Sequence, residues 1–575
     1  MQGCEKTDTN IDQNPNPLRV IIGIESFEEA MDKGCYYVDK TLFIKHVLDH
    51  DNAKVQLYTR PRRFGKTLLL SMVKCFFGMK RNKDDILKTK RYFEGMKIYS
   101  AGERYISCMN SRPVIFLSFA SVDCMKYQES MYILKQRVSD MYAKFAYLEN
   151  RIEDESQRES FNRLLNATPK LSELSCSLNF LSKIIYAVEG KKAVILIDEY
   201  DTPLHGAFEN NYYQKMLNVV SLIMSTALDT NNCLDFAIVC GCMRISDELL
   251  FASIDNNAYF SVTSPQIEPF FGFTEPEVKK MLQDFELEEM FEEVNLWYNG
   301  YLIGDIPIYN PWSIANFIFN VKFNNTQTPN EFPQEWANSS SHSLVRNLIS
   351  KSKEKDKFEL LLSGKSIYAP VYQTQDFYDI YSKPENIWSI LLFAGYLKPV
   401  SFSNGKHELS IPNQEVMEIY RSILRSLFNS EIKAKHKDAL YQALINEDES
   451  SLQNEISNLF FSCIGYWDIS AEGYYHGFVA STFDWFDDIY AKSNTETGNG
   501  IPYIEAYCST NNTMYLFEIK TFKTKTIDSR IKQMLVQKHI ERAMAERYRV
   551  VAYVLGFSSK RCYIKKVADS SKFDK

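Results

Sequence analysis

Two short segments of the chain contain residue types whose spacing suits phosphate chemistry. The first, RPRRFGKT at residues 60–67, follows an apolar run at residues 55–59 and precedes a helical pattern. A glycine lets backbone N–H groups approach a phosphate, a lysine reaches its terminal oxygens, and a threonine hydroxyl can ligate Mg²⁺. Gly65, Lys66 and Thr67 therefore match the second half of a P-loop.

The first half of this loop departs from the usual GxxxxGK[ST] pattern. Arg60 stands where the first glycine belongs, and Arg62 and Arg63 follow it. Three guanidinium groups would add positive charge beside a bound anion. The alternative is a strand-loop-helix joint that contains GKT by chance. The loop residues expected to bind a nucleotide are Arg60, Arg62, Arg63, Phe64, Gly65, Lys66 and Thr67.

The second segment, VILIDEYD at residues 194–201, has the form of a Walker B strand. Asp198 and Glu199 end an apolar run, and α/β sheets bind ligands at the carboxyl ends of their strands. Asp198 would hold Mg²⁺ through water and Glu199 would polarise the attacking water, so Glu199 joins Lys66 as an expected catalytic residue. The alternative is a strand that ends in acidic turn residues. Together the two segments predict binding of ATP with Mg²⁺.

Arg244 lies just beyond another apolar run, residues 234–240. If this run is a parallel strand of the same sheet, Arg244 reaches the edge at which the P-loop lies and could sense a γ-phosphate. A surface arginine in a loop is an equally good interpretation.

A second candidate site lies near the C-terminus, in MYLFEIK. Alternation along a strand puts Glu518 and Lys520 on one face. Glu518 could bind Mg²⁺ while Lys520 orients a water molecule. The alternative is an exposed strand face on which the two charges pair. From Lys520 onward the chain has 15 Lys and Arg but 5 Asp and Glu, which predicts a nucleic-acid partner, DNA favoured, or else a solvated helix face.

The elements that position these residues form an α/β protein of several domains. The 575 residues exceed one core of about 150 residues, and apolar runs alternate with helical patterns as in a parallel sheet. We expect a loose tail at 1–17, a P-loop domain at 18–270, a helical, winged-helix-like domain at 271–400, a helical connector at 401–470 and a small α/β domain at 471–575. Thr274 and Glu277 form a capping box at the start of the second domain.

Composition excludes several classes of protein. With 45% apolar residues and a net charge of −7, the chain is neither disordered nor a polycation that coats nucleic acid. The 12 cysteines include no CxxC pair, which favours reduced thiols in a cytoplasmic protein. No apolar run is long enough for a signal peptide or a membrane span, so no membrane partner is expected.

Seven segments read together as the pattern of one family: GIESFEEAMDKGCYYVDKTLFIKHVL, LYTRPRRFGKTLLLSMVKCFF, VILIDEYDTPL, GCMRISDELLF, FGFTEPEV, WYNGY and YNPWSI. They resemble the AAA-ATPase-like family that many bacteria carry beside a C-terminal PD-(D/E)XK nuclease-like domain. The resemblance extends over nearly the whole chain after residue 18. It implies that an arginine in place of the first P-loop glycine is the usual form, and that Asp39 and Lys40 lie near the nucleotide.

The C-terminal unit departs from this family at one position. The family reads close to GRGRxD before the ExK strand, whereas this chain reads GNGIPY and ends on Tyr503. A phenol cannot replace a carboxylate on Mg²⁺. Glu505, two residues on, could be a migrated carboxylate, or the site could be retired.

Three functions compete on these observations. The first is an ATPase whose cycle controls a nucleic-acid-binding, Mg²⁺-dependent nuclease-like domain. The second is an ATP-dependent switch or scaffold with an inactive recognition domain, which a homo-oligomer or an unknown protein partner would suit. A small-molecule kinase is less favoured because no lid for a phosphate acceptor is evident.

Overall fold

The computed structural model describes residues 19–50, 52–245, 250, 257–264, 269–323, 348–349, 354–362, 364–373, 385–464, 479–480, 482–483, 485–494, 503–521, 549–558 and 561–570. The tail expected at 1–17 and the helix expected at 528–547 lie outside these ranges. The chain divides into two units, the first made of Met1–Pro333 with Ala369–Glu415 and the second of Gln334–Tyr368 with Val416–Lys575.

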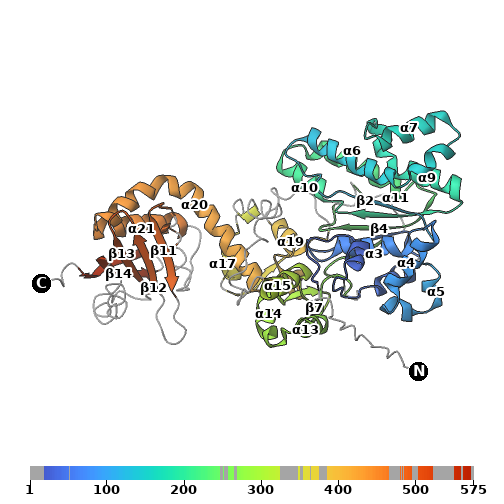
Figure 1. Cartoon of the computed structure of the whole chain (residues 1–575). Coiled ribbons are helices and arrows are strands. Elements are labelled where there is room, and N and C mark those ends of the chain that lie inside the picture. Colours follow the sequence, from blue (N-terminus) through green and yellow to red (C-terminus); the bar gives the residue numbers. More distant parts are fainter. Residues whose placement is uncertain are drawn as a thin grey trace, which may run out of the picture. The chain divides into compact units, whose positions relative to one another are not determined.

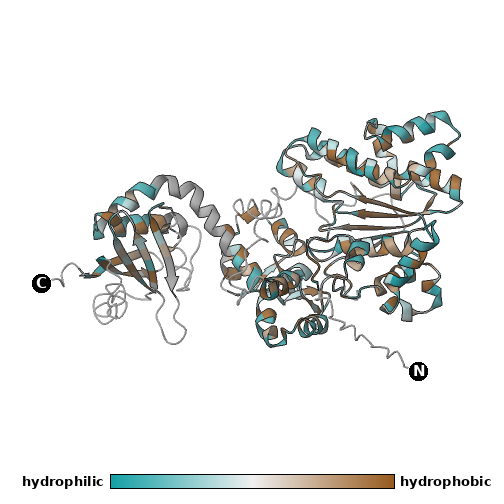
Figure 2. Ribbon diagram, in the orientation of Figure 1, coloured by the Kyte–Doolittle hydropathy of each residue, from teal (hydrophilic) through white to brown (hydrophobic). Residues whose placement is uncertain are grey.

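A five-stranded parallel sheet forms the centre of the first unit. Its order is β2-β3-β4-β1-β5 and every pairing is parallel. The strands are β1 (Val55–Thr59), β2 (Val114–Ser118), β3 (Ala193–Asp198), β4 (Leu234–Gly241) and β5 (Asn257–Phe260). Every residue of β1 and β3 is buried, as expected when both faces of a sheet are covered, and the strands of this sheet are largely brown in Figure 2.

Helices cover both faces of this sheet, which confirms the predicted α/β arrangement. Figure 1 shows α6 (Tyr127–Ala143), α9 (Ser177–Glu189) and α11 (Tyr213–Leu228) on one face and α3 (Lys66–Phe77) with α4 (Lys83–Phe93) on the other. In α11 the buried residues recur every three or four positions, which forms one apolar stripe. The remaining helices here are α1 (Phe27–Asp32), α2 (Leu42–Asp49), η1 (Lys97–Ala101), α5 (Glu103–Ile106), η2 (Ala146–Arg151), α7 (Glu155–Leu165), α8 (Leu171–Ser175) and α10 (Thr202–Glu209).

The rest of the first unit is mainly helical, with two hairpins. It contains α13 (Glu275–Asp284), η3 (Glu288–Met290), α14 (Phe291–Tyr298), β6 (Tyr301–Ile303), β7 (Ile306–Ile308), α15 (Pro311–Phe323), α19 (Asn386–Phe393), β9 (Lys398–Ser403) and β10 (Lys406–Ser410). The predicted capping box is present at the start of α13, where the Glu277 carboxylate accepts the Thr274 N–H at 2.8 Å. Val20, Tyr36 and Val38 pack against the apolar cluster of these helices, so the N-terminal segment lies beside the region that follows the sheet.

The second unit contains a mixed five-stranded sheet of order β11-β12-β13-β14-β15. Its strands are β11 (Ile489–Asn494), β12 (Tyr503–Cys508), β13 (Thr513–Thr521), β14 (Arg549–Ser558) and β15 (Arg561–Asp569), and only β13 and β14 pair in parallel. The apolar cluster of this unit joins residues 440–459 to the sheet. The helices α20 (Gln414–Ile445) and α21 (Glu449–Ile464), expected as a connector, therefore contribute to the core of this unit. The other helix of this unit is α17 (Lys355–Leu362). The strand β8 (Ile367–Ala369) forms a three-stranded sheet of order β8-β10-β9.

No helix within the described ranges combines the length and apolar character that a bilayer crossing requires.

Candidate functional site

The P-loop is the turn between β1 and α3. Gly65 caps α3 with φ +78°, a left-handed conformation that favours glycine. A Cβ at this position would meet nothing within 4 Å, so the backbone angle, and not lack of space, requires the glycine. The first N–H groups of α3 lack partners within the helix and form the end that attracts anions.

Lys66 lies inside this loop and is 6% exposed. Its Nζ donates to the carbonyl oxygens of Arg60 at 3.0 Å and Pro61 at 2.8 Å, and lies 3.7 Å from Cys242 Sγ. Within the described part of the chain it forms no ion pair, so its charge is not neutralised there. A phosphate at the loop would give this ammonium its counter-charge.

Thr67 and Asp198 bring the two sequence motifs together. The Thr67 hydroxyl donates to Asp198 Oδ2 at 2.6 Å. Asp198 is fully buried, and its Oδ1 makes no hydrogen bond to any described residue. Burial raises the pKa of Asp198 to about 6, against the hydrogen bond from Thr67. A hydroxyl beside a carboxylate with one unused oxygen is a donor set that fits Mg²⁺.

Glu199 ends the same strand in a strained turn. Its φ is +53°, a conformation uncommon for residues with a Cβ and often found at functional sites. The Thr202 hydroxyl donates to Glu199 Oε2 at 3.2 Å, and Glu199 lines the cavity beside the P-loop. The two adjacent carboxylates therefore have different surroundings: Asp198 is bonded to Thr67, and Glu199 lines the cavity.

Of the three loop arginines, Arg63 lines the cavity, whereas Arg62 and Arg60 do not. Burial lowers the pKa of Arg62, yet Cys242, Asp201 and Glu199 outweigh it and the net shift is upward. Arg63 has φ +67°, lines the cavity, and its guanidinium lies 4.0 Å from the centre of the Trp312 ring. This stacking is a cation–π contact.

The structure does not place Arg60 where a phosphate could meet it. Its side chain is fully buried, and Nη1 donates to the carbonyl oxygens of Thr59 at 2.6 Å and Phe260 at 2.8 Å. Its guanidinium lies 5.0 Å from the Phe271 ring. Burial lowers the pKa of Arg60 to about 10. The guanidinium is therefore engaged by the ends of β1 and β5, and Arg60 does not line the cavity.

Phe64 joins the P-loop to the region that follows the sheet. It is 2% exposed, and its ring meets the Tyr301 ring edge-on, with 5.1 Å between centroids. The loop sequence predicts that Phe64 binds the nucleotide. In the structure its ring is an apolar anchor that also borders the cavity.

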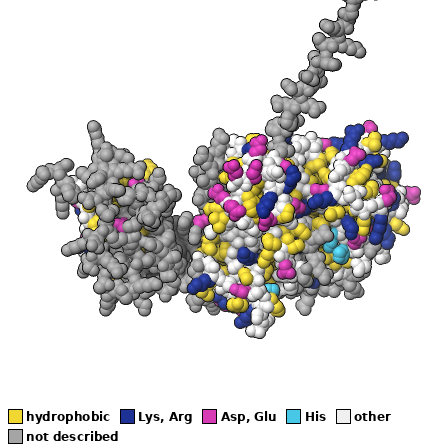
Figure 3. All heavy atoms as spheres, turned by 90° about the horizontal axis from the view of Figure 1, so that it is seen from below, with side chains coloured by type: hydrophobic (Ala, Val, Ile, Leu, Met, Phe, Trp, Pro, Cys, Tyr) yellow, Lys and Arg dark blue, Asp and Glu magenta, His cyan; other side chains and the backbone are white. Residues whose placement is uncertain are grey.

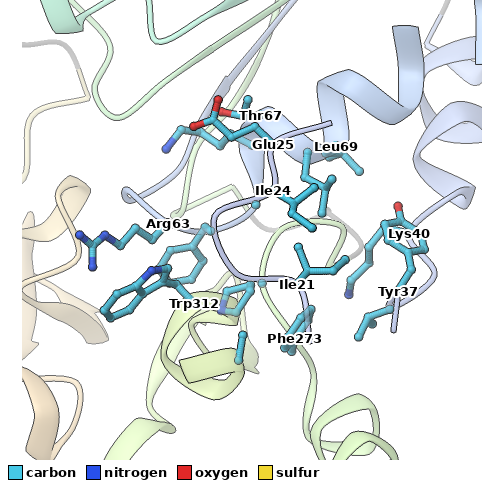
Figure 4. A pocket seen from close by; sticks show the side chains of 18 of the residues that line it. Ile21, Ile24, Glu25, Tyr37, Lys40, Arg63, Thr67, Leu69, Phe273 and Trp312 are labelled. Atoms are coloured by element: carbon cyan, nitrogen blue, oxygen red, sulfur yellow. The ribbon is translucent and has the colours of Figure 1, made fainter. Parts of the chain in front are cut away.

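A cavity of about 380 Å³ opens beside the P-loop. Figure 4 shows Arg63 with Trp312 at one side, Tyr37 with Lys40 at the other, and Ile21 between them. Most of the wall is apolar or aromatic. Trp312 was missed as a site residue; the only signal for it was its place in the segment YNPWSI.

Lys40 lines this cavity, as the family resemblance implies, whereas Asp39 does not. Lys40 Nζ forms an ion pair with Glu277 at 2.7 Å and donates to the Pro269 carbonyl at 2.8 Å. Asp39 instead accepts the N–H groups of Thr41 at 2.9 Å and Lys97 at 2.7 Å. Asp39 thus fixes the start of α2.

Arg244 follows β4, whose position between β1 and β3 brings this strand end to the same edge of the sheet. Its guanidinium lies 4.4 Å from the centre of the Tyr259 ring. Arg244 does not line the cavity.

Glu415, in the first turn of α20, lies next to the stacked Arg63 and Trp312. The Ser313 hydroxyl is 2.9 Å from both of its carboxylate oxygens. Glu415 retains some exposed surface, but burial of its carboxylate raises the pKa to about 7, against the hydrogen bond from Ser313 and the charge of Arg63. Ionised Glu415 is therefore a cost to the fold above pH 7.

We expect Glu415→Gln to stabilise the protein at pH 8 and to have little effect at pH 5. The folded pKa lies above the ordinary value of 4.5, so the fold loses stability as pH rises from 4.5 to 7, by at most about 3 kcal/mol. Glutamine carries no charge at either pH and can still accept from Ser313. Thermal unfolding at both pH values measures the effect, with the exposed Glu289→Gln as control. A difference that does not grow with pH would contradict the assignment.

The C-terminal candidate residues lie on paired strands. Tyr503 is the register partner of Glu518, and Glu505 is that of Leu516, so Glu505 and Glu518 are one diagonal step apart on one face. Glu518 is only 7% exposed, which does not fit an exposed strand face. The side chains of Tyr503 and Lys520 lie outside the described ones.

The described acidic and metal-ligating side chains bear on how a metal ion could be bound. In the part of the chain that the structure covers, no group of three or more His, Cys, Asp and Glu could hold a metal ion. A Mg²⁺ at Asp198 would thus take its other ligands from phosphate and water.

Several cations of the C-terminal unit are paired with carboxylates. Arg549 and Lys566 bond to Glu447 and Asp569, and Lys565 lies 3.7 Å from Glu449. In the first unit, the face shown in Figure 3 carries Lys and Arg side chains among Asp and Glu side chains. In the second unit, the ion pairs of Arg549, Lys565 and Lys566 reduce the positive charge that these three residues could offer to a nucleic acid.

Two comparisons show which known proteins this chain is similar to. The chain is 23% identical over 543 residues to a protein of Azotobacter chroococcum mcd 1 described as "Uncharacterized protein in vnfD 5'region", covering 92% of this chain and 93% of that one. Residues 21–251 match a family model described as "Predicted AAA-ATPase". That match contains the P-loop, the Walker B strand and Arg244, and it ends before the C-terminal unit. Residues 21–251 are therefore similar to predicted AAA-ATPases, which suggests ATP binding.

Proposed function

We propose that the first unit binds ATP with Mg²⁺ and hydrolyses it. The observation that carries this proposal is the 2.6 Å hydrogen bond between Thr67 and Asp198 Oδ2, beside the buried Lys66. Residues far apart in sequence meet there in the combination that phosphoryl transfer to water requires. The family match over residues 21–251 supports the same conclusion.

Each residue of this site has a distinct role in the proposed reaction. Lys66 exchanges its carbonyl partners for the β- and γ-phosphate oxygens, and the N–H groups at the start of α3 bind the same anion. Thr67 and Asp198 hold the metal ion, which neutralises phosphate charge when bound. Glu199 orients and polarises the water, and its position at the cavity wall is suitable for this.

The cavity beside the P-loop is the proposed site of the base and ribose. Its apolar and aromatic wall suits a purine, which is bound by burial and stacking. Trp312 already has Arg63 on one face. Arg63 could therefore contact both this ring and the phosphates.

Thermal unfolding of the full chain with ATP·Mg²⁺ tests the proposal. A ligand at 100 times its dissociation constant stabilises the folded state by about 2.7 kcal/mol. We expect a rise in Tm with ATP that is larger with Mg²⁺ than with EDTA, since Thr67 and Asp198 contribute only through the metal. Phosphate release measured on the same sample tests hydrolysis. No shift with ATP or GTP would contradict the proposal.

For the second unit we propose a nucleic-acid-binding, PD-(D/E)XK-like domain. The strand directions, with an antiparallel β11-β12-β13 and a parallel β13-β14 pair, support this fold, as does the burial of Glu518. The register that sets Tyr503 opposite Glu518 favours the alternative, in which this unit only recognises a ligand or protein partner within an ATP-dependent switch.

We expect the full chain to bind DNA, and RNA more weakly, with an affinity that falls as salt rises. Counterion release gives a log–log slope near −0.9 per phosphate neutralised on duplex DNA. Fluorescence anisotropy at about 50 and 200 mM salt measures it. If the Mg²⁺ site is active, Glu518→Ala abolishes cleavage and spares binding. If no binding to DNA or RNA is detected even at low salt, the ATP-dependent switch becomes the favoured function.

A further inference from the structure

Asp201 is a buried carboxylate of the Walker B segment to which the proposed reaction gives no role. It is 1% exposed. Its Oδ2 accepts the backbone N–H groups of Cys242 at 2.9 Å and Met243 at 3.0 Å, and lies 3.3 Å from His205 Nε2. Burial raises the pKa of Asp201, but the contacts with His205 and the Met243 N–H outweigh it, and the pKa ends below its usual value. The group is therefore a buried anion with three donors.

Tyr200 binds the same loop. Its hydroxyl donates to the Met243 carbonyl and accepts the Ile245 N–H at 3.3 Å. At Gly241 an added Cβ would lie 2.5 Å from the Tyr200 ring and 2.8 Å from Asp201 Oδ1, so only glycine fits there. The turn after β3 thus holds the turn after β4 at close range.

The turn after β4 contains Cys242, which contacts Lys66 of the phosphate site, and Arg244, which does not line the cavity. Cys242 Sγ lies 3.7 Å from Lys66 Nζ, and Arg244 follows two residues later. Since Cys242 and Met243 are bonded through their backbone to Asp201, the carboxylate fixes the path of the chain between these groups. Without it, two buried N–H groups would lose their acceptor, and the turn would have to rearrange.

We propose that Asp201 is a positioning residue that holds the turn after β4, with Cys242 and Arg244, against Lys66 and the phosphate site. Asp201 does not touch the nucleotide. The inference rests on the proposed hydrolysis of ATP. Loss of the Asp201 carboxylate is therefore expected to slow the chemical step, because displacement of a catalytic group by about 1 Å can cost about 100-fold in rate.

The kinetic test compares Asp201→Ala and Asp201→Asn with the wild type. We expect kcat for ATP hydrolysis to fall 10- to 100-fold in Asp201→Ala while KM changes less than threefold, as for a group that acts in the transition state only. Asparagine keeps one oxygen acceptor and should restore part of kcat. Asp140→Asn, on α6, is the matched control. An unchanged kcat, or a fall in kcat accompanied by loss of ATP binding, would overturn the proposal.

A second measurement requires no ATPase activity. Cys242 is 8% exposed, and its alkylation by N-ethylmaleimide without nucleotide, mapped by mass spectrometry, reports the position of the turn. We expect at least tenfold faster alkylation of Cys242 in Asp201→Ala, with Cys75 in α3 still protected. The positioning role would be overturned if Cys242 were alkylated at the same rate in Asp201→Ala and the wild type. It would also be overturned if Cys75 became as reactive as Cys242 in Asp201→Ala, because the whole domain would then have loosened. If the wild type hydrolyses no ATP, the proposed function fails, and the alkylation still decides the role of Asp201 in holding the turn.

Discussion

The Glu199→Gln variant is expected to bind ATP·Mg²⁺ as the wild type does and to hydrolyse it at least about tenfold more slowly. The amide keeps the size of the side chain and can still accept from Thr202, so the turn after β3 is preserved. It cannot polarise water as a carboxylate does. Asp198, which bonds to Thr67, is unchanged, so metal binding is retained. Phosphate release gives the turnover and thermal unfolding gives the binding.

The matched control for this variant is Glu209→Gln. Glu209 is an exposed carboxylate at the end of α10, the helix that follows the same turn. It should leave turnover and binding unchanged. Equal turnover of Glu199→Gln and wild type would assign the water-positioning role to another residue. A loss of ATP binding would instead show that Glu199 holds the metal.

The Lys66→Ala variant is expected to lose the stabilisation that ATP·Mg²⁺ gives the wild type. Lys66 Nζ lies inside the loop, where it donates to the backbone carbonyls of Arg60 and Pro61. Its removal leaves the phosphates with the α3 N–H groups and with the guanidinium groups of Arg62 and Arg63. At an ATP concentration that stabilises the wild type by about 2.7 kcal/mol, a 100-fold weaker affinity leaves only about 0.4 kcal/mol.

Lys83→Ala is the control for loss of a positive charge. Lys83 is an exposed residue at the start of α4, away from the cavity lining. It should keep the full thermal shift. If ATP stabilised Lys66→Ala as much as the wild type, the nucleotide would have to bind elsewhere and the P-loop assignment would be wrong.

In the second unit, the pairing of the strands determines the surroundings of Glu518 and Tyr503, which the sequence did not predict. Alternation put Glu518 and Lys520 on one face of a strand, and this follows from any extended backbone. Burial of Glu518 to 7% exposure depends on its neighbours in β12 and β14. Likewise, the partner of Tyr503 is set by the register of two strands, which composition does not reveal.

In the first unit, the residues proposed to bind phosphate could be predicted from the sequence. The backbone angle at position 65 requires a glycine, and Lys66, Thr67 and Asp198 are the residue types that phosphate and Mg²⁺ chemistry would need. The meeting of Thr67 with Asp198 follows from a parallel sheet, in which strand ends share one edge. Such features depend on residues adjacent in the chain, or on a topology that apolar periodicity predicts.

The side chains that surround these residues could be identified only from the packing of the folded chain. Arg60 was expected beside the phosphate, but the carbonyls of Thr59 and Phe260 at the ends of β1 and β5 bind its guanidinium. Trp312 meets Arg63 from a distant segment of the chain, and Asp201 meets Cys242 only because β4 lies next to β3. The physical reason is that a buried polar group bonds to whatever donor or acceptor the strand order and packing bring to it. Residue type and spacing do not specify that partner.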